Sequence, residues 1–388
     1  VGPPSQTPLR ILYDHQIFDS QIHGGISRYF VELLREAWKA GAPRCRLGAL
    51  LSNNDYLKDA PFPRPARFFP GVRWLRKGNH LTAVNRRWSL RCIARGDFDL
   101  LHPTYYGTYF LPRLGDRRFV LTVYDMIHEL LPHTSGSSGR TAERKRTLAA
   151  RAAGIIAISE STRRDAIRLL GLPPEKVRTI HLGGPKVLET ELPPPPGLAD
   201  PYVLFVGQRG DYKNFATFLA GMAPLLRDDG RLRVVCAGGR AFDAAEVEAA
   251  RALGVDGRVL HVAGPSDDSL AALYQHARAF AFPSRYEGFG LPVLESFAFG
   301  CPAVLARSSS LPEIGGEAAS YFDPESAESI GAAVDRVLRD EPLRRAMIEA
   351  GRRRAREFSW ERTARETWAY YAEVSGALSP GAPPVTAS

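Results

Sequence analysis

The chain has 388 residues, of which 44% are hydrophobic and 24% charged, and it carries a formal net charge of +9. This composition is ordinary for a globular protein and excludes a fibrous or wholly disordered chain. The length exceeds what one hydrophobic core usually serves, so we expect two domains of about 180 residues each.

Two further features bear on the cellular compartment. No apolar run reaches the roughly 18–20 residues that a membrane-spanning helix needs, and the first residues lack a signal-peptide pattern. The four cysteines lie far apart and show no metal-binding spacing (Cys45, Cys92, Cys236, Cys301). We therefore expect reduced, mostly buried thiols and a cytoplasmic protein.

Charge is distributed unevenly along the chain. Residues 1–200 contain 30 Lys and Arg against 18 Asp and Glu, whereas the remainder contains 21 against 24. The densest basic stretch, residues 58–95, has ten basic residues, one acid and five large aromatic side chains. Basic residues mixed with aromatic ones suit an anionic membrane surface or a nucleic acid. An arginine-rich face exposed to solvent is the alternative interpretation.

Short apolar stretches alternate with amphipathic ones in the first half. The pattern predicts strands at residues 9–13, 46–51, 98–102, 119–123, 154–158 and 177–181, and helices at 25–39, 80–95, 140–152 and 160–170. This alternation is typical of a mostly parallel sheet covered on both faces. Residues 134–139 read TSGSSG, the composition of a flexible linker, and one hypothesis is that this segment replaces a native loop.

Residues 184–201 predict a domain boundary, because a run of four prolines joins neither a helix nor a central strand. The alternation then restarts, with strands predicted at 202–206, 232–236, 258–262, 279–282 and 303–305, and helices at 214–227, 243–253, 267–276, 292–299, 326–339, 342–357 and 357–374. Residues 377–388 have the composition of a disordered tail. Two doubly wound halves place a ligand cleft between them, at the carboxyl ends of their strands.

Two short motifs fall at those carboxyl ends. Gly24 and Gly25 open the helix at 25–39, where a glycine pair serves either as a tight turn or as an anion-binding helix terminus. Arg209 and Lys213 follow the strand at 202–206. Two cations at such a position suit a diphosphate.

The third motif reads EGFGLPVLE and runs from Glu287 to Glu295. Pro292 predicts the start of a helix, so the amide groups of residues 288–291 would lie free at its N-terminus. Glu295 falls in the predicted first turn, where the helix dipole alone favours an acid. A carboxylate in a cleft also commonly accepts hydrogen bonds from a ribose diol. No structural reason of this kind applies to Glu287.

Together these motifs resemble those of the retaining glycosyltransferases of family 4, which have the GT-B fold: two Rossmann-like, doubly wound α/β domains facing each other across a cleft. The residues that carry the resemblance are Gly24-Gly25, Arg209, Lys213 and the E-x7-E pair Glu287/Glu295, with shorter matches in AISESTRRDAI (157–167), GCPAVLARSSSLPEIGGEAASYFDP (300–324) and FSWERTA (358–364). The resemblance covers nearly the whole chain.

The resemblance implies a domain organisation. Residues 1–183 would form the acceptor-binding domain, 184–201 the linker, and 202–358 the nucleotide-sugar-binding domain. The last helix, within 359–376, would pack back on the first domain.

The resemblance also implies roles on the donor side. Arg209 and Lys213 would neutralise the donor diphosphate and the charge that grows on it, which is electrostatic catalysis. Glu295 would hold the ribose hydroxyls, and Glu287 would lie beside the transferred sugar. Gly24 and Gly25 would let the first helix approach the diphosphate. Amides that would contact sugar hydroxyls or phosphate belong to Gly288, Phe289, Gly290 and Leu291.

On the acceptor side, the resemblance places Asp125 near the acceptor, with Tyr124, His128 and Ser159 as further candidates. Many relatives have a His-Asp pair after the strand equivalent to 119–123, whereas this chain reads VYDMIHE. Tyr212 also departs from the family, because it stands where many relatives have a second arginine. The family works without a metal or other cofactor, and we expect the same here.

The implied function is transfer of a hexose or deoxyhexose, mannose-like or rhamnose-like, from a nucleotide-diphosphate sugar. The acceptor would be a glycan or a polyprenyl-diphosphate-linked molecule in bacterial surface polysaccharide synthesis. The anomeric configuration would be retained by attack on the same face. The basic stretch 58–95 would rest on an anionic membrane, at the inner face of the cell membrane.

Two alternatives remain open. A nucleotide-sugar 2-epimerase of the same architecture is one, although we do not find the histidine and carboxylate set that it needs. A basic nucleic-acid-binding protein is the other, and only the charge balance favours it.

Overall fold

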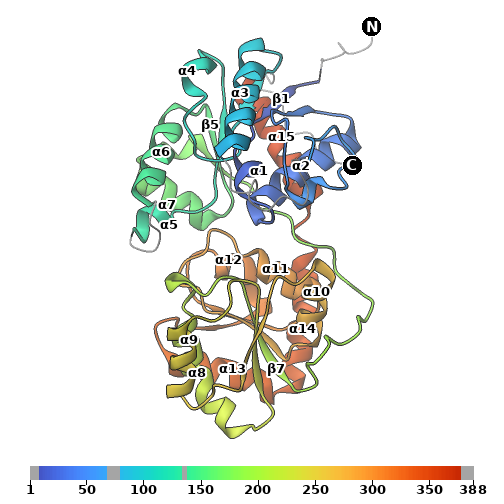
Figure 1. Ribbon diagram of the computed structural model, residues 1–388, viewed down its shortest axis with the longest axis vertical. Helices are drawn as coiled ribbons and strands as arrows, with labels where there is room; N and C mark the ends of the chain where they lie inside the picture. The colour runs from blue at the N-terminus through green and yellow to red at the C-terminus, as the bar shows by residue number, and fades with distance from the viewer. Residues whose placement is uncertain (1–7, 68–78, 133–137, 377–388) are drawn as a thin grey trace.

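A computed structural model describes residues 8–67, 79–132 and 138–376, and these form two lobes, one above the other in Figure 1. Three predictions fall outside those residues wholly or in part. They concern the middle of the basic stretch (68–78), most of the linker-like segment (133–137) and the tail (377–388), and they stay predictions.

The first lobe is built on parallel strands in the order β2-β1-β3-β4-β5-β6. Two three-stranded sheets meet where Leu101 in β3 pairs with Phe119, directly before β4. The strands are β1 (Arg10–Tyr13), β2 (Arg44–Leu47), β3 (Leu100–His102), β4 (Val120–Val123), β5 (Gly154–Ala157) and β6 (Val177–Thr179). The helices are α1 (Gln16–Ser20), α2 (Gly25–Ala40), α3 (Asn79–Arg95), α4 (Leu111–Leu114), α5 (Ile127–Leu130), α6 (Ser138–Arg151) and α7 (Glu160–Leu170).

The second lobe has a six-stranded sheet in the order β12-β11-β10-β7-β8-β9, and its strand pairs are parallel. The strands are β7 (Tyr202–Val206), β8 (Arg233–Ala237), β9 (Val259–Val262), β10 (Ala279–Phe282), β11 (Ala303–Ala306) and β12 (Ala319–Phe322). The helices are α8 (Phe215–Asp228), α9 (Ala244–Ala252), α10 (Asp267–His276), α11 (Leu291–Ala298), α12 (Leu311–Gly315), α13 (Ala327–Arg339) and α14 (Glu341–Ala355).

These sheets confirm the predicted fold class of two doubly wound α/β domains. The central strands β4, β5, β10 and β11 are buried along their whole length, as expected for parallel strands covered on both faces. The predictions omit β12 and the short helices α1, α4, α5 and α12. The four helices are too short to show a helical period. Strand β12 lies at the edge of its sheet and is only half-buried.

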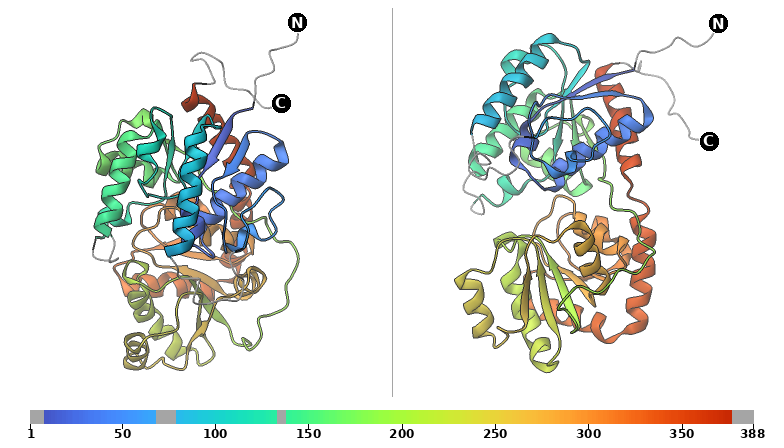
Figure 2. Two further views of the ribbon diagram at one scale, coloured as in Figure 1. Left: turned by 45° about the horizontal axis from the view of Figure 1, so that its top comes forward. Right: turned by 45° about the vertical axis from the view of Figure 1, so that its right-hand side comes forward.

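The chain crosses between the lobes twice. Residues 184–200 contain no helix or strand and run along the second lobe, where Leu188 donates its amide to Ala298. Helix α15 (Trp360–Ser375) then returns to the first lobe (Figure 2). There the Tyr371 hydroxyl lies 3.2 Å from that of Tyr13 and 2.5 Å from Nδ1 of His102. The core of the first lobe therefore includes side chains from the last helix.

Candidate active site

A hollow of about 460 Å³ lies between the two lobes. First-lobe residues that line it are Gly25, Ile26, Arg28, Tyr29, Tyr56, Tyr124, Asp125, Ile127, Ile158 and Leu182, and second-lobe residues are Tyr212, Glu287, Gly288, Phe289, Gly290, Leu291, Pro292 and Glu295. The structure thus brings together the EGFGLPVLE motif, Gly25, Tyr124 and Asp125. Five predicted site residues, all in the described part of the chain, do not line the hollow: Gly24, Arg209, Lys213, His128 and Ser159.

Two glycines shape the wall that the second lobe contributes. Gly290 precedes α11 with φ = 109°, a conformation that favours glycine. A Cβ atom on Gly288 would lie 1.8 Å from the carbonyl oxygen of Tyr124, so only glycine fits there. Across the hollow, a Cβ on Gly25 would lie 3.2 Å from Cδ1 of Leu291. Gly288 therefore allows the backbones of the two lobes to approach each other.

Lys213 forms an ion pair with Glu287, with 2.6 Å between Nζ and Oε1. Burial alone would lower the pKa of Lys213, but Glu287, with a smaller contribution from Tyr212, outweighs burial and the pKa is raised. The ammonium group therefore stays charged. Lys213 does not itself line the hollow, but its partner Glu287 does.

Arg209 is paired with a different carboxylate, and the expectation that both cations bind one diphosphate stays a prediction. Its Nε donates to Glu246 at 2.9 Å, and its guanidinium carbon lies 4.5 Å from the ring centre of Phe242. The Nη1 atom of Arg209 is buried without a partner. The loop after β8 and the start of α9 supply both the carboxylate and the ring, so each cation is held by its own glutamate.

Glu295 lines the hollow, but it does not lie in the first turn of its helix. Helix α11 begins at Leu291, which puts Glu295 in the second turn and removes the helix dipole as its explanation. Tyr274 donates its hydroxyl to the carboxylate at 3.2 Å, and Arg28 of the first lobe lies 3.7 Å away. Burial raises the pKa of Glu295, and Arg28 only partly opposes this. The carboxylate retains capacity to accept further hydrogen bonds.

Asp125 belongs to a charged cluster in the first lobe. His128 places Nδ1 3.9 Å from the Asp125 carboxylate, and burial lowers the pKa of this histidine. Lys145 is fully buried, and its Nζ donates to the carbonyl oxygen of Asp125 and to Glu129, both at 2.8 Å. Lys145 was not predicted. Its only sequence signal is a helical spacing with buried Leu148 and Ala149.

Two of the acceptor candidates, Ser159 and Tyr124, have hydrogen-bond partners within the protein. Ser159 is fully buried, and its hydroxyl donates to the carbonyl oxygen of Gly288 at 2.7 Å, so it is not available to an acceptor. Tyr124 lines the hollow, and its hydroxyl donates to the carbonyl oxygen of Thr104 at 3.2 Å. Ser159 therefore joins the first lobe to the second.

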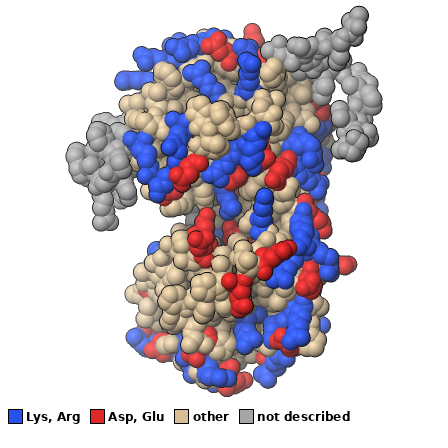
Figure 3. Space-filling model, turned by 90° about the vertical axis from the view of Figure 1, so that its right-hand side faces the viewer, with Lys and Arg blue, Asp and Glu red and all other residues tan. Residues whose placement is uncertain are grey.

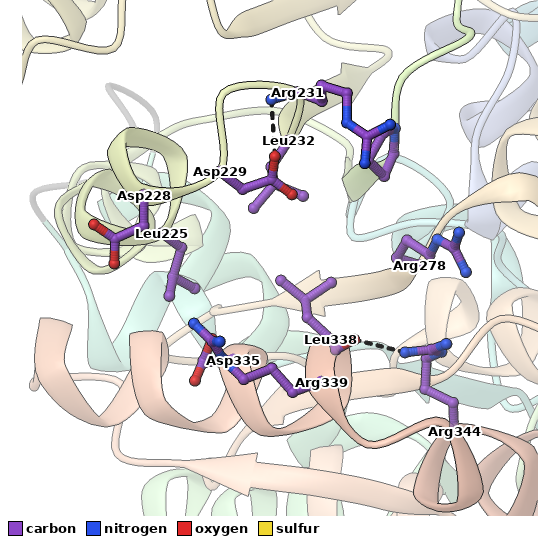
Figure 4. Close-up of a pocket in the computed structure, with 11 residues that line it drawn as sticks. Leu225, Asp228, Asp229, Arg231, Leu232, Arg278, Asp335, Leu338, Arg339 and Arg344 are labelled. Atoms are coloured by element: carbon purple, nitrogen blue, oxygen red, sulfur yellow. Dashed lines mark hydrogen bonds and ion pairs between the residues drawn. The ribbon is translucent and has the colours of Figure 1, made fainter.

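A second hollow, of about 540 Å³, lies at the opposite end of the second lobe (Figure 4). Pro201, Leu232 and Arg278 line it, and each directly precedes a strand. This hollow therefore lies at the amino ends of the strands, whereas ligands of doubly wound sheets bind at the carboxyl ends. Arg339 and Asp335 in its wall pair with each other at 2.7 Å. The hollow between the lobes is the candidate active site.

Residues 8–67, 79–132 and 138–376 contain neither a metal-binding cluster nor a membrane-spanning helix. No group of three or more His, Cys, Asp or Glu side chains there could hold a metal ion. No helix in that part of the chain combines the length and apolar character needed to span a bilayer. On the face shown in Figure 3, Lys and Arg side chains are spread over the first lobe.

Two family profiles match the chain, one on each lobe. Glycosyltransferase Family 4 matches residues 23–183, and Glycosyl transferases group 1 matches residues 193–354. The O-antigen chain mannosyltransferase B of Escherichia coli is 30% identical over 227 residues, which are 55% of this chain and 58% of that protein. The MMP alpha-(1->4)-mannosyltransferase of Mycolicibacterium hassiacum is 40% identical over 123 residues, 31% of this chain and 30% of that protein. The matches span less than two thirds of these relatives.

Solved structures share the fold at low sequence identity. Sucrose-phosphate synthase from Thermosynechococcus elongatus has a TM-score of 0.72 and 18% identity, covering 96% of this chain and 100% of that one. HepE of Anabaena, in complex with UDP and glucose, has a TM-score of 0.73 and 15% identity, covering 94% of this chain and 100% of that one. These likenesses show a common two-domain architecture.

Proposed function

Since the chain belongs to the glycosyltransferases of family 4, we propose that it moves a hexose or deoxyhexose from a nucleotide-diphosphate sugar to a glycan or lipid-linked acceptor. The sugar is mannose-like or rhamnose-like, and the product belongs to a bacterial surface polysaccharide. The names of the mannosyltransferase relatives support the sugar class and the process. The observation that carries the proposal is the hollow between the lobes, which Glu287, Glu295 and Asp125 line together.

In the proposed reaction, the second lobe holds the donor. Glu295 accepts hydrogen bonds from the ribose hydroxyls, and Lys213 neutralises the diphosphate. Its raised pKa keeps it cationic as negative charge grows on the leaving phosphate. Arg209 joins Lys213 after it exchanges Glu246 for phosphate oxygens, because its Nε donates to Glu246 and its unpartnered Nη1 is buried.

The acceptor enters from the first lobe, beside Asp125. Its hydroxyl oxygen bonds to the anomeric carbon on the face from which the diphosphate departs, so the configuration is retained. The bond between the anomeric carbon and the phosphate oxygen breaks, and the leaving phosphate takes the hydroxyl proton. The proposal assigns no step to a metal. The membrane contact of residues 58–95 belongs to the same proposal, and vesicles of anionic lipid test it.

The test is a panel of nucleotide sugars, read by thermal shift and by release of nucleoside diphosphate, with and without EDTA. We expect one nucleotide-diphosphate mannose or rhamnose donor to stabilise the protein and to be consumed. Glu287→Gln should fold normally and lose turnover, whereas Glu317→Gln, at an exposed residue in the same lobe, should match the wild type. Failure of every donor to bind or turn over contradicts the proposal.

The same experiment separates the alternatives. An epimerase converts its nucleotide sugar into an epimer without any acceptor, which chromatography of the products detects. A nucleic-acid-binding protein binds DNA with a steep dependence on salt and consumes no donor.

A further inference from the structure

Two motifs from the sequence have no place in the reaction above. AISESTRRDAI (157–167) runs from the end of β5 into α7 in the first lobe, and SLPEIGG in the segment 300–324 contains α12 in the second. In the structure these two segments meet across the lobe boundary. Neither Glu313 of α12 nor Ser159 lines the hollow between the lobes.

Glu313 is the centre of this contact. Its Oε1 accepts the amide of Glu160 at 2.8 Å, and its Oε2 accepts the amide of Ser161 at 3.1 Å. These are amides of the first turn of α7, which have no partner within their own helix. Nε2 of His181, also in the first lobe, lies 2.6 Å from Oε1 of Glu313. One carboxylate of the second lobe thus joins three groups of the first.

The first lobe holds a backbone group of the second lobe in return. Ser159 Oγ donates to the carbonyl oxygen of Gly288 at 2.7 Å, and Thr162 Oγ1 donates to the same oxygen at 3.0 Å. Both lone pairs of that carbonyl are therefore occupied. The Cα of Gly288 meanwhile faces the carbonyl of Tyr124 too closely for any side chain. The first lobe thereby fixes the Gly288–Phe289 peptide, directly after Glu287.

The charge state of Glu313 suits this contact. Burial alone would raise its pKa, but the hydrogen bonds from His181, Glu160 and Ser161 outweigh burial, and the pKa is lowered. The group is a carboxylate at neutral pH. Its hydrogen bonds are then charge-assisted, which makes them the stronger kind.

We propose that Ser159, Thr162, His181 and Glu313 form a clasp between the lobes, in which Glu313 is a positioning residue for the active site. It fixes the start of α7, and α7 in turn fixes the Gly288 carbonyl through Ser159 and Thr162. Glu287 is thereby held where it meets Lys213 and the hollow. The positioning role rests on the proposed glycosyl transfer, whereas the clasp itself does not.

The experiment compares the wild type with Glu313→Gln, Thr162→Val and the control Glu317→Gln. Hydrogen exchange at the amides of Glu160 and Ser161 reports the clasp directly. Steady-state kinetics with the donor found above report its effect on the site. Circular dichroism and thermal unfolding verify that each variant is folded.

For Glu313→Gln we expect the two α7 amides to exchange on the order of tenfold faster, because hydrogen bonds to a charged group are lost. We also expect kcat to fall about tenfold while the donor KM stays within about twofold, since the donor contacts of the second lobe are intact. For Thr162→Val we expect wild-type exchange at α7 and a kcat about threefold lower, because one donor to Gly288 remains. Glu317→Gln should behave like the wild type.

Wild-type exchange in Glu313→Gln overturns the clasp. Faster exchange in this variant with unchanged kcat overturns the positioning role. If Glu313→Gln does not fold, Thr162→Val decides, and an unchanged kcat there overturns the positioning role as well. If the wild type consumes no donor, the proposed function fails, and the exchange result alone decides whether the clasp exists.

Discussion

The substitution Gly288→Ala tests how tightly the lobes are fitted at the candidate active site. The added Cβ would lie 1.8 Å from the carbonyl oxygen of Tyr124, and real Cβ atoms essentially never approach closer than 3.0 Å. The two backbones must therefore separate by at least 1.2 Å. Both partners are main-chain groups, so no side-chain rotation relieves the contact. The hydrogen bonds from Ser159 and Thr162 to Gly288 must stretch as well.

A displacement of about 1 Å between reacting groups can cost roughly 100-fold in rate, so we expect kcat to fall about 100-fold. The assay is steady-state release of nucleoside diphosphate, with Gly230→Ala as the control. A Cβ on Gly230 meets no atom within 4 Å, and this residue lies in the same lobe. Wild-type kcat in a folded Gly288→Ala protein would refute the reasoning.

Three further predictions concern polar groups that are partly or fully buried. The pKa of Glu313 is lowered from 4.5, so its contribution to stability is complete above about pH 4.5 and is lost as the pH falls through the folded-state pKa. The free energies of unfolding of the wild type and Glu313→Gln, measured in urea, should therefore differ at pH 7 and converge in acid. Tyr371→Phe leaves Nδ1 of the buried His102 without a partner, and we expect a loss of about 1–3 kcal/mol in the free energy of unfolding, measured by urea titration; equal midpoints would contradict this. Glu246→Gln weakens the hydrogen bond between Arg209 and residue 246, so the donor KM should fall about threefold in steady-state assays. An unchanged or higher KM would show that Glu246 does not compete with the donor for Arg209.

The sequence predicts the secondary structure that carries the site with good accuracy. The buried strand β10 and the glycines after it are visible from periodicity and residue type, and these place Glu287 at the mouth of the hollow. The start of α11 is one residue earlier than Pro292 indicates, because proline is tolerated at the second helical position as well as the first. That small difference removes the simple explanation of Glu295.

Partners from remote parts of the chain were not predictable. Arg209 and Glu246 are 37 residues apart, and no local pattern joins a loop after β7 to the start of α9. Ser159 and Gly288 are 129 residues apart and lie in different lobes. A serine before a helix is fully explained by capping. Its second bond, to the other lobe, depends on how the lobes are arranged, which no local pattern encodes.

The return of α15 to the first lobe has a consequence for synthesis on the ribosome. Tyr13 in β1 meets Tyr371 across 358 residues of chain, and Tyr370 accepts the amide of Ile155 in β5. After the last strand of the first lobe is made, about 190 further residues must be translated before these partners exist, which takes roughly 10–40 s at ordinary rates. During that interval, α15 does not yet cover the first lobe. The surface that it later covers is therefore exposed to chaperones and to other chains. The order of maturation is therefore inverted, since the second lobe can complete its core before the first.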